Sequence, residues 1–252
     1  MSKGFRIVNF KKAKPIFEVE NLSKSFDGRP ILKKINMKLF RGEIVGLLGP
    51  NGSGKSTLYS TIIGEIGIDQ GKIYLDNKEI QNLPIHLRAN AGLGYLSQER
   101  SVFAMSTYDN LFGLAQLCIK GTTNQIKMVE RLLDEFNMQH LRNVQSTVLS
   151  GGEVRRVMLA RLLINNPKVV LLDEPLAALD PIVVEDIQKY IVKLQRMGIT
   201  ILVTDHAVQN LMSIVDKLYV LGDQEIIASG KVQDVLKSSK AIEMYFGSSF
   251  KQ

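Results

Sequence analysis

A glycine-rich segment at residues 49–57 has the composition and spacing of a phosphate-binding loop. It fits the pattern G-x-x-x-x-G-K-[ST], follows an apolar run at 44–48, and precedes a helix-like stretch from Lys55 to about Glu65. Glycines allow successive backbone N–H groups to point into one cavity, and the start of the next helix adds unpaired donors and a positive dipole end. A glycine-rich turn before an ordinary helix is the alternative. We predict a nucleotide site formed by Gly49, Pro50, Asn51, Gly52, Ser53, Gly54, Lys55, Ser56 and Thr57.

Two adjacent carboxylates supply the second half of the predicted chemistry. Asp173 and Glu174 follow a continuously apolar run at 169–172, which is typical of a strand buried on both faces of a parallel sheet. In proteins with a phosphate-binding loop, an Asp at this strand end holds Mg²⁺ together with the loop hydroxyl, here Ser56, while Lys55 reaches the β- and γ-phosphates. Glu174 can polarise a water molecule in line with the γ-phosphate.

Gln98 and His206 each stand at the end of a predicted strand, at 93–97 and 200–204. The second of these strands is expected to run parallel to the one that carries Asp173, so their carboxyl ends open onto the same crevice. We therefore predict that His206 contacts the γ-phosphate and that Gln98 reaches Mg²⁺ or the attacking water. Taken alone, each would more often be an ordinary polar residue at a strand end.

A second helix start with the character of an anion site lies at residues 149–153. Ser150 stands at an N-cap position before Gly151 and Gly152, and a helix is expected over 154–164. A chain with one nucleotide and two such helix starts either holds two ligands or shares each ligand between two chains. A plain serine-capped helix is the remaining alternative.

Phe26 is the candidate for base recognition. It precedes a turn at 27–30, upstream of the phosphate loop, where an aromatic ring could stack on adenine. The alternative is a small hydrophobic anchor for the turn.

The surrounding sequence predicts an α/β fold, with alternating strand-like and helix-like segments on both sides of one purely helical region. Residues 107–148 contain two helical runs and no strand pattern, and the second run has an apolar stripe of period 3.6. A helical insertion over roughly residues 85–165 of the α/β chain is therefore expected.

Composition excludes several classes of protein. The 252 residues are 45% hydrophobic and 23% charged, as in soluble globular domains, and no apolar run reaches membrane-spanning length. The one cysteine, Cys118, cannot form an internal disulfide and suits a reducing compartment.

Five positive charges of the net +7 precede Glu18, which predicts a flexible basic arm at 1–15. That arm could rest on anionic lipid; no basic patch interleaved with aromatics follows it, so nucleic acid is not expected as a partner.

Taken in order, these motifs resemble the ATP-binding-cassette (ABC) ATPases. The resemblance rests on the phosphate loop, Gln98, the signature at 149–153, Asp173 with Glu174, and His206, and Leu179-Asp180 matches the family's D-loop. It implies a RecA-like core with an antiparallel β subdomain and an inserted α-helical subdomain. It implies an ATPase domain at 16–238, followed by a C-terminal tail at 239–252.

The resemblance also implies a mechanism. ATP with Mg²⁺ would be held between two copies of the chain in a head-to-tail homodimer, so that Ser150, Gly151, Gly152 and Asp180 of one copy reach the nucleotide of the other. Hydrolysis by water that Glu174 polarises, with Lys55, Gln98 and His206 assisting, would open the dimer and perform mechanical work.

Within this family, several stretches are similar to the lipopolysaccharide-export ATPases. They lie at residues 94–99, 106–111, 134–142, 204–208 and 245–250. This implies a peripheral protein on the cytoplasmic face of the bacterial inner membrane that never touches the transported molecule. It would grip integral-membrane permease subunits through a groove near Phe103, where Ala104-Met105 replaces a basic pair common in those proteins. A branched-chain amino-acid importer ATPase and a soluble ABC protein without a permease are the alternatives.

Overall fold

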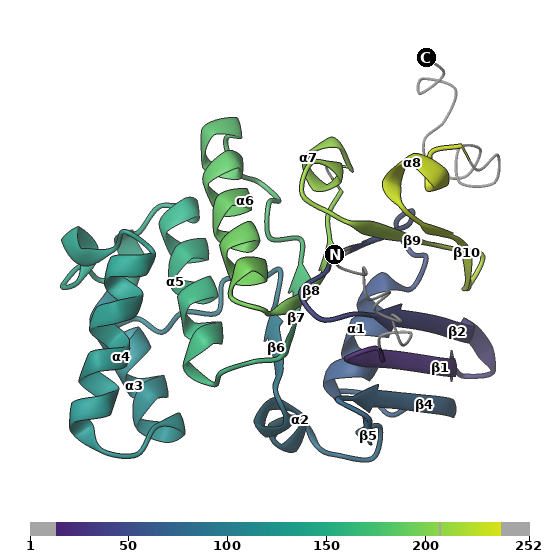
Figure 1. The fold of residues 1–252 in the computed structure, drawn as a ribbon, viewed down its shortest axis with the longest axis horizontal. Coiled ribbons are helices and arrows are strands. Elements are labelled where there is room, and N and C mark those ends of the chain that lie inside the picture. Colours follow the sequence, from purple (N-terminus) through teal and green to yellow (C-terminus); the bar gives the residue numbers. More distant parts are fainter. Residues whose placement is uncertain (1–13, 207, 238–252) are drawn as a thin grey trace, which may run out of the picture.

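The computed structural model describes residues 14–206 and 208–237. The predictions for residues 1–13 of the basic arm and for the tail at 239–252 lie outside the described residues. The described chain contains one four-stranded and one six-stranded sheet. Helices α3 (Thr107–Cys118), α4 (Thr122–Glu135), α5 (Gly151–Ile164) and α6 (Pro181–Arg196) gather beyond one side of the larger sheet (Figure 1).

The six-stranded sheet carries the predicted functional strand ends. Its order is β10-β9-β3-β8-β7-β6, in which the last five strands are parallel and β10 pairs with β9 in the antiparallel sense. Continuous apolar sequence forms β3, β7 and β8 because both faces of these strands are buried. The strands are β3 (Ile44–Leu48), β6 (Leu93–Leu96), β7 (Val169–Asp173), β8 (Thr200–Thr204), β9 (Lys217–Gly222) and β10 (Glu225–Gly230).

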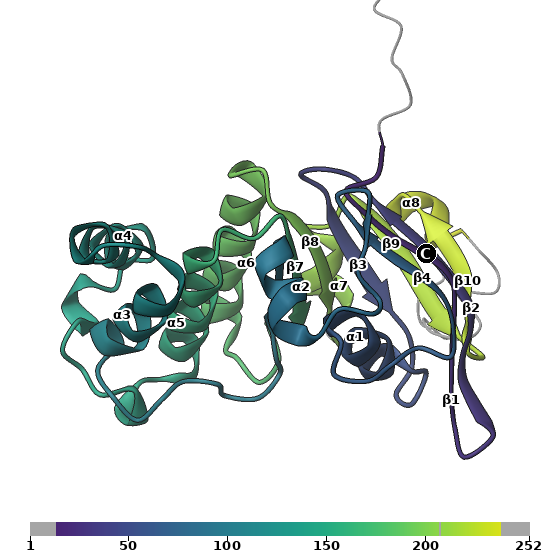
Figure 2. The same cartoon turned by 90° about the horizontal axis from the view of Figure 1, so that it is seen from below.

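The four-stranded sheet is antiparallel and has the order β2-β1-β4-β5. It lies on the opposite side of the larger sheet from helices α3 to α6, with α1 between the two sheets (Figures 1 and 2). Its two long strands meet at the turn after Phe26. The strands are β1 (Phe17–Phe26), β2 (Arg29–Leu39), β4 (Gln70–Leu75) and β5 (Lys78–Glu79).

The helices are α1 (Lys55–Ile63), α2 (Ile85–Ala91), α3 (Thr107–Cys118), α4 (Thr122–Glu135), α5 (Gly151–Ile164), α6 (Pro181–Arg196), α7 (Val208–Met212) and α8 (Val232–Val235). Two short 3₁₀ turns lie at Gln139–Leu141 and Ser146–Val148. The helix expected from residue 154 begins three residues earlier, because Ser150 and Glu153 cap it reciprocally. The mixed α/β fold with a helical subdomain is confirmed. Since β6 belongs to the large sheet, we propose that α3 to α5 form the inserted subdomain.

Two hydrophobic cores lie on the two faces of the six-stranded sheet. Ile44 and Leu48 of β3 belong to the core under the helices, whereas Val45 and Leu47 of the same strand belong to the core shared with α1 and the antiparallel sheet. Residues of β7 and β8 alternate in the same way because successive side chains of a strand point to opposite faces. The sheet is therefore rigidly held from both sides, and its strand ends are fixed positions for functional groups.

Candidate nucleotide-binding and hydrolysis site

The phosphate loop joins the end of β3 to the start of α1. Gly54 caps the helix at φ +102° without a side-chain cap, and no acidic residue occupies the first turn, so the helix start keeps free N–H donors for an anion. Gly49 has no room for a side chain, since an added Cβ would lie 2.4 Å from the Leu221 carbonyl oxygen. Ser53 Oγ is buried and has no hydrogen-bond partner among the described residues, as expected of a donor that waits for a ligand.

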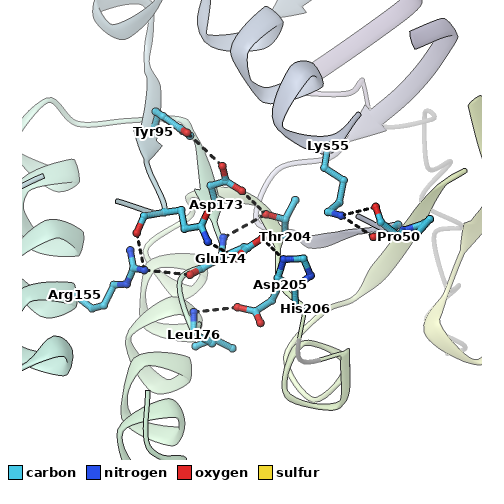
Figure 3. A network of polar contacts seen from close by, with 12 residues as sticks. Pro50, Lys55, Tyr95, Arg155, Asp173, Glu174, Leu176, Thr204, Asp205 and His206 are labelled. Atoms are coloured by element: carbon cyan, nitrogen blue, oxygen red, sulfur yellow. Dashed lines mark hydrogen bonds and ion pairs between the residues drawn. The ribbon is translucent and has the colours of Figure 1, made fainter. Parts of the chain in front are cut away.

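Lys55 is folded back over the loop (Figure 3). Its Nζ donates to the carbonyl oxygens of Gly49 at 2.6 Å and Pro50 at 3.1 Å. Burial lowers the pKa of Lys55, while the negative charges of Glu174 and Asp173 act in the opposite direction. Both hydrogen-bond acceptors of this ammonium group are neutral carbonyl oxygens, so a bound phosphate would neutralise its charge. The loop therefore fits the phosphates of a nucleoside triphosphate. Ser56 and Asn51 are exposed beside it, and Thr57 is partly buried.

Asp173 is oriented by the two strands that flank β7. Thr204 of β8 donates from Oγ1 to Asp173 Oδ1 at 2.8 Å, and the Tyr95 hydroxyl of β6 donates to Oδ2 at 3.4 Å (Figure 3). Burial raises the pKa of Tyr95, which keeps the phenol protonated and able to donate. The carboxylate therefore has a defined direction before any ligand binds.

The structure brings Gln98, Glu174 and His206 together. Gln98 Nε2 donates to Glu174 Oε2 at 2.8 Å, and His206 Nε2 lies 2.5 Å from Glu174 Oε1. Glu174 has φ +49°, and its N–H donates to the Thr204 carbonyl oxygen at 3.0 Å, so the strained backbone is held by β8. Side chains that follow two parallel strands, β6 and β8, thus converge on the carboxylate that follows the strand between them, β7.

Arg155 of α5 is a site residue that the sequence analysis missed. Its guanidinium donates to the carbonyl oxygens of Ser97 at 3.1 Å, Gln98 at 3.0 Å and Glu174 at 3.3 Å. Burial lowers its pKa, and Asp205, Asp173 and Glu174 act in the opposite direction. Arg155 therefore links α5 to the segment after β6 and to the end of β7. Nothing in the sequence distinguishes it from the other arginines of α5, Arg156 and Arg161.

The remaining predicted residues lie apart from this network. No hydrogen bond or ion pair joins Ser150, Gly151, Gly152 or Asp180 to the phosphate loop within the described chain. The glycines instead permit close packing against α6, since a Cβ on Gly152 would lie 2.4 Å from Val183 Cγ1. Asp180 stands at the N-cap of α6 without a side-chain cap bond.

Phe26 ends β1 with 45% of its surface exposed. Lys24 Nζ lies 5.3 Å from the centre of its ring. The exposed ring is thus available for stacking, whereas a buried anchor of the turn would have been covered.

Comparison with known proteins decides the family. The model of the family described as ABC transporter matches residues 32–177. The chain is 41% identical over 238 residues to the lipopolysaccharide export system ATP-binding protein LptB of Haemophilus influenzae, a match that covers 94% of this chain and 99% of the relative. The chain belongs to the ABC transporter family. It is an ABC ATPase, with the cassette fold that its motifs predicted.

Solved cassettes have the same architecture as this ABC ATPase. The ADP conformation of MJ1267, an ATP-binding cassette of an ABC transporter, is 30% identical with a TM-score of 0.83, covering 93% of this chain and all of that one. The dimeric structure of MJ0796, a bacterial ABC transporter cassette, is 26% identical with a TM-score of 0.76, covering 86% and 98% of the two chains. Cassettes of this family therefore bind adenine nucleotides and form dimers.

The donors for a metal ion in this ABC ATPase are few. No group of three or more His, Cys, Asp and Glu side chains that could hold a metal occurs among residues 14–206 and 208–237. The exposed Ser56 hydroxyl and the pre-oriented Asp173 are hard oxygen donors, which suit an Mg²⁺ ion that takes its other ligands from phosphate and water. The residues present fit that ion in the company of a nucleotide.

Proposed function

We propose that this ABC ATPase powers the extraction of lipopolysaccharide from the inner membrane and its export toward the outer membrane. The near full-length match to a lipopolysaccharide-export relative at 41% identity is the observation that supports the cargo. The convergence of Gln98, Glu174 and His206 beside the phosphate loop supports the chemistry.

In the proposed reaction, the loop at 49–57 and Lys55 bind the phosphates of ATP. Ser56, Asp173 and Gln98 would hold Mg²⁺, which when bound neutralises charge on the β- and γ-phosphates. Glu174 orients the attacking water and accepts its proton, while His206 contacts the γ-phosphate. One oxygen of the Glu174 carboxylate accepts a hydrogen bond from Gln98, and the other contacts His206. These two side chains therefore set the position of the base.

The signature residues of the proposed homodimer act on the nucleotide of the partner copy. Ser150, Gly151 and Gly152 would present the start of α5 to the γ-phosphate, with Asp180 nearby on the connection to α6. The absence of any hydrogen bond or ion pair between these residues and the phosphate loop of their own chain, within the described residues, supports this arrangement. The dimers formed by related cassettes support it as well.

The proposed permease contact is a groove between the helical layer and the large sheet. A cavity of about 420 Å³ there is lined by Tyr95 and Leu96 of β6, Leu114 and Leu117 of α3, and residues of α2 and α5. At its rim Phe103 is 60% exposed, with the Arg161 guanidinium 5.1 Å from the centre of its ring. An apolar groove of this kind suits a helix of a membrane protein.

The proposed location is the cytoplasmic face of the inner membrane, as a peripheral subunit that does not touch the transported molecule. No helix in the described part of the chain is long and apolar enough to cross a bilayer. In this proposal separate permease subunits form the membrane path, and nucleic acid is not a partner.

Co-purification tests this function. The chain is tagged, membranes are solubilised in mild detergent, and associated proteins and lipids are identified by mass spectrometry. Two different permease subunits with bound lipopolysaccharide are the expected result. An amino-acid permease pair would contradict the cargo and favour an importer, and soluble partners alone would contradict transport altogether.

A further inference from the structure

The N-terminus of α5 is already capped by a carboxylate side chain of the same chain, that of Glu153. One carboxylate oxygen of Glu153, Oε2, accepts from the Ser150 N–H at 2.8 Å and from the Ser150 hydroxyl at 2.7 Å. In return, Ser150 Oγ accepts from the Glu153 N–H at 3.4 Å. The hydroxyl proton and one lone pair of Ser150 are therefore both committed within the chain.

This arrangement conflicts with the role proposed for Ser150. A hydroxyl that donates to Glu153 cannot at the same time donate to a phosphate oxygen with that proton. The carboxylate also places a negative charge at the helix start, where the negative γ-phosphate of a partner's ATP would have to approach. A phosphate thus has to displace Glu153 before it can be bound.

We infer that Glu153 is an internal competitor of the γ-phosphate and sets the ATP concentration at which the two copies close. The inference rests on the proposed dimer, in which Ser150 meets the partner's nucleotide. In the open state Glu153 caps α5 and keeps the signature occupied. Closure requires the carboxylate to turn away, so part of the binding free energy of ATP is used to release it.

The flank of α5 provides a place for the displaced carboxylate. Arg156 is one helical turn further along the same side of α5, and both Arg156 and His140 attract the Glu153 charge. These two residues line a cavity of about 530 Å³ together with Asp134, whose carboxylate is already bonded to Gln139. Arg156 uses one nitrogen to donate to the Asn137 carbonyl oxygen at 3.2 Å and retains other donors for Glu153.

The substitution Glu153→Gln separates charge from capping. The amide oxygen of Gln can accept the same two bonds from Ser150, so α5 stays capped while the competing charge is lost. In the hydrolysis-deficient background Glu174→Gln, we expect E153Q to lower the ATP concentration for half-maximal dimerisation by about three- to tenfold, the scale of one like-charge pair in a partly solvated site. Dimerisation is measured by light scattering at fixed protein concentration.

Two controls make the result specific. Glu79→Gln removes the same charge from the exposed strand β5 of the separate four-stranded sheet and should leave the ATP requirement of the Glu174→Gln protein unchanged. The affinity for a fluorescent ADP analogue should also stay the same in E153Q, because ADP has no γ-phosphate to compete. If Glu153 served only to cap α5, E153Q would leave both the cap and the ATP requirement unchanged.

The outcomes distinguish this inference from the function on which it rests. If the Glu174→Gln protein forms an ATP-dependent dimer and E153Q does not lower the ATP requirement, the inference is overturned while the proposed dimer stands. If the Glu174→Gln protein forms no ATP-dependent dimer, both are overturned. A lowered requirement with unchanged ADP affinity supports the competitor role of Glu153.

Discussion

At the scale of residues, the carboxylates of Asp173 and Glu174 are held by different neighbours. Glu174 sits where the Gln98 amide and the His206 ring reach its two oxygens, at 2.8 Å and 2.5 Å. Asp173, one residue earlier, is instead oriented by the hydroxyls of Thr204 and Tyr95. Adjacent residues of one strand end therefore face different partners, which allows one to hold a metal ion and the other to act as a base.

Replacement of Glu174 by Gln should abolish turnover without loss of ATP binding. The amide keeps the shape of the side chain and its contact with Gln98 but cannot accept a proton from water, and loss of a general base typically costs about 10²- to 10⁴-fold in rate. ATP should then accumulate a closed dimer, detected by gel filtration, while phosphate release falls. Near-normal phosphate release would show that another group is the base.

Replacement of Phe26 by Ala should weaken ATP binding more than it lowers the maximal rate. In the predicted role the exposed ring would stack on the base, worth about 1–3 kcal/mol in comparable aromatic contacts, and that contribution would be present before the reaction begins. We expect KM for ATP to rise by about five- to 150-fold with kcat little changed. An unaltered KM would show that Phe26 does not stack on the base and serves only as a hydrophobic anchor for the turn.

The contact between α5 and α6 governs the site at the scale of elements. Gly152 lets the start of α5 approach α6 so closely that a Cβ would lie 2.4 Å from Val183 Cγ1. Glu174 lies in the segment that connects α5 to α6, and Arg155 of α5 donates to its carbonyl oxygen. The start of α5, the end of β7 and the start of α6 are consequently parts of one packed unit.

Replacement of Gly152 by Ala should therefore push α5 away from α6. Overpacking of this kind costs about 1–3 kcal/mol, and we expect a lower melting temperature together with a higher ATP requirement for dimerisation. The double variant Gly152→Ala/Val183→Ala frees the space again and should recover both properties in part. Additive effects of the two substitutions would show that the contact does not matter.

The strand ends could be predicted from sequence because buried parallel strands leave long apolar runs that stop at polar residues. This logic located Gln98, Asp173 and His206, and the structure places them at the ends of adjacent strands. The capping role of Glu153 also had a signal, the spacing Ser-x-x-Glu before an apolar helix. Arg155 had none of comparable strength, since its carbonyl partners come from distant segments that only the fold brings close.

At the scale of the whole molecule, the nucleotide site and the groove near Phe103 lie on different parts of the structure and share the strand β6. Leu96 and Tyr95 line the groove, while the Tyr95 hydroxyl contacts Asp173. Gln98 follows two residues later and contacts Glu174. A partner seated in the groove would thus touch the strand whose end carries groups of the hydrolytic site.

Replacement of Phe103 by Asp should separate the ATPase from its membrane partner. A carboxylate at the rim of an apolar groove would have to be desolvated when a helix docks, at a cost of several kcal/mol. We expect loss of permease subunits from the co-purified complex, with retention of the ATP-dependent dimer in the Glu174→Gln background. Replacement of Leu117, 84% exposed in the same groove, by Met serves as the conservative control. Undiminished permease recovery with Asp at position 103 would argue against this groove as the docking surface.

The division of the large sheet into two faces has a consequence for how such proteins can diversify. The helices beside the groove pack on one core, and the phosphate-loop helix with the antiparallel sheet packs on the other. Because alternate residues of each strand serve separate cores, substitutions beneath the helices can be compensated there without disturbing the opposite core. The surface that the helices present can therefore change between related proteins while the phosphate-loop helix keeps its packing against the antiparallel sheet.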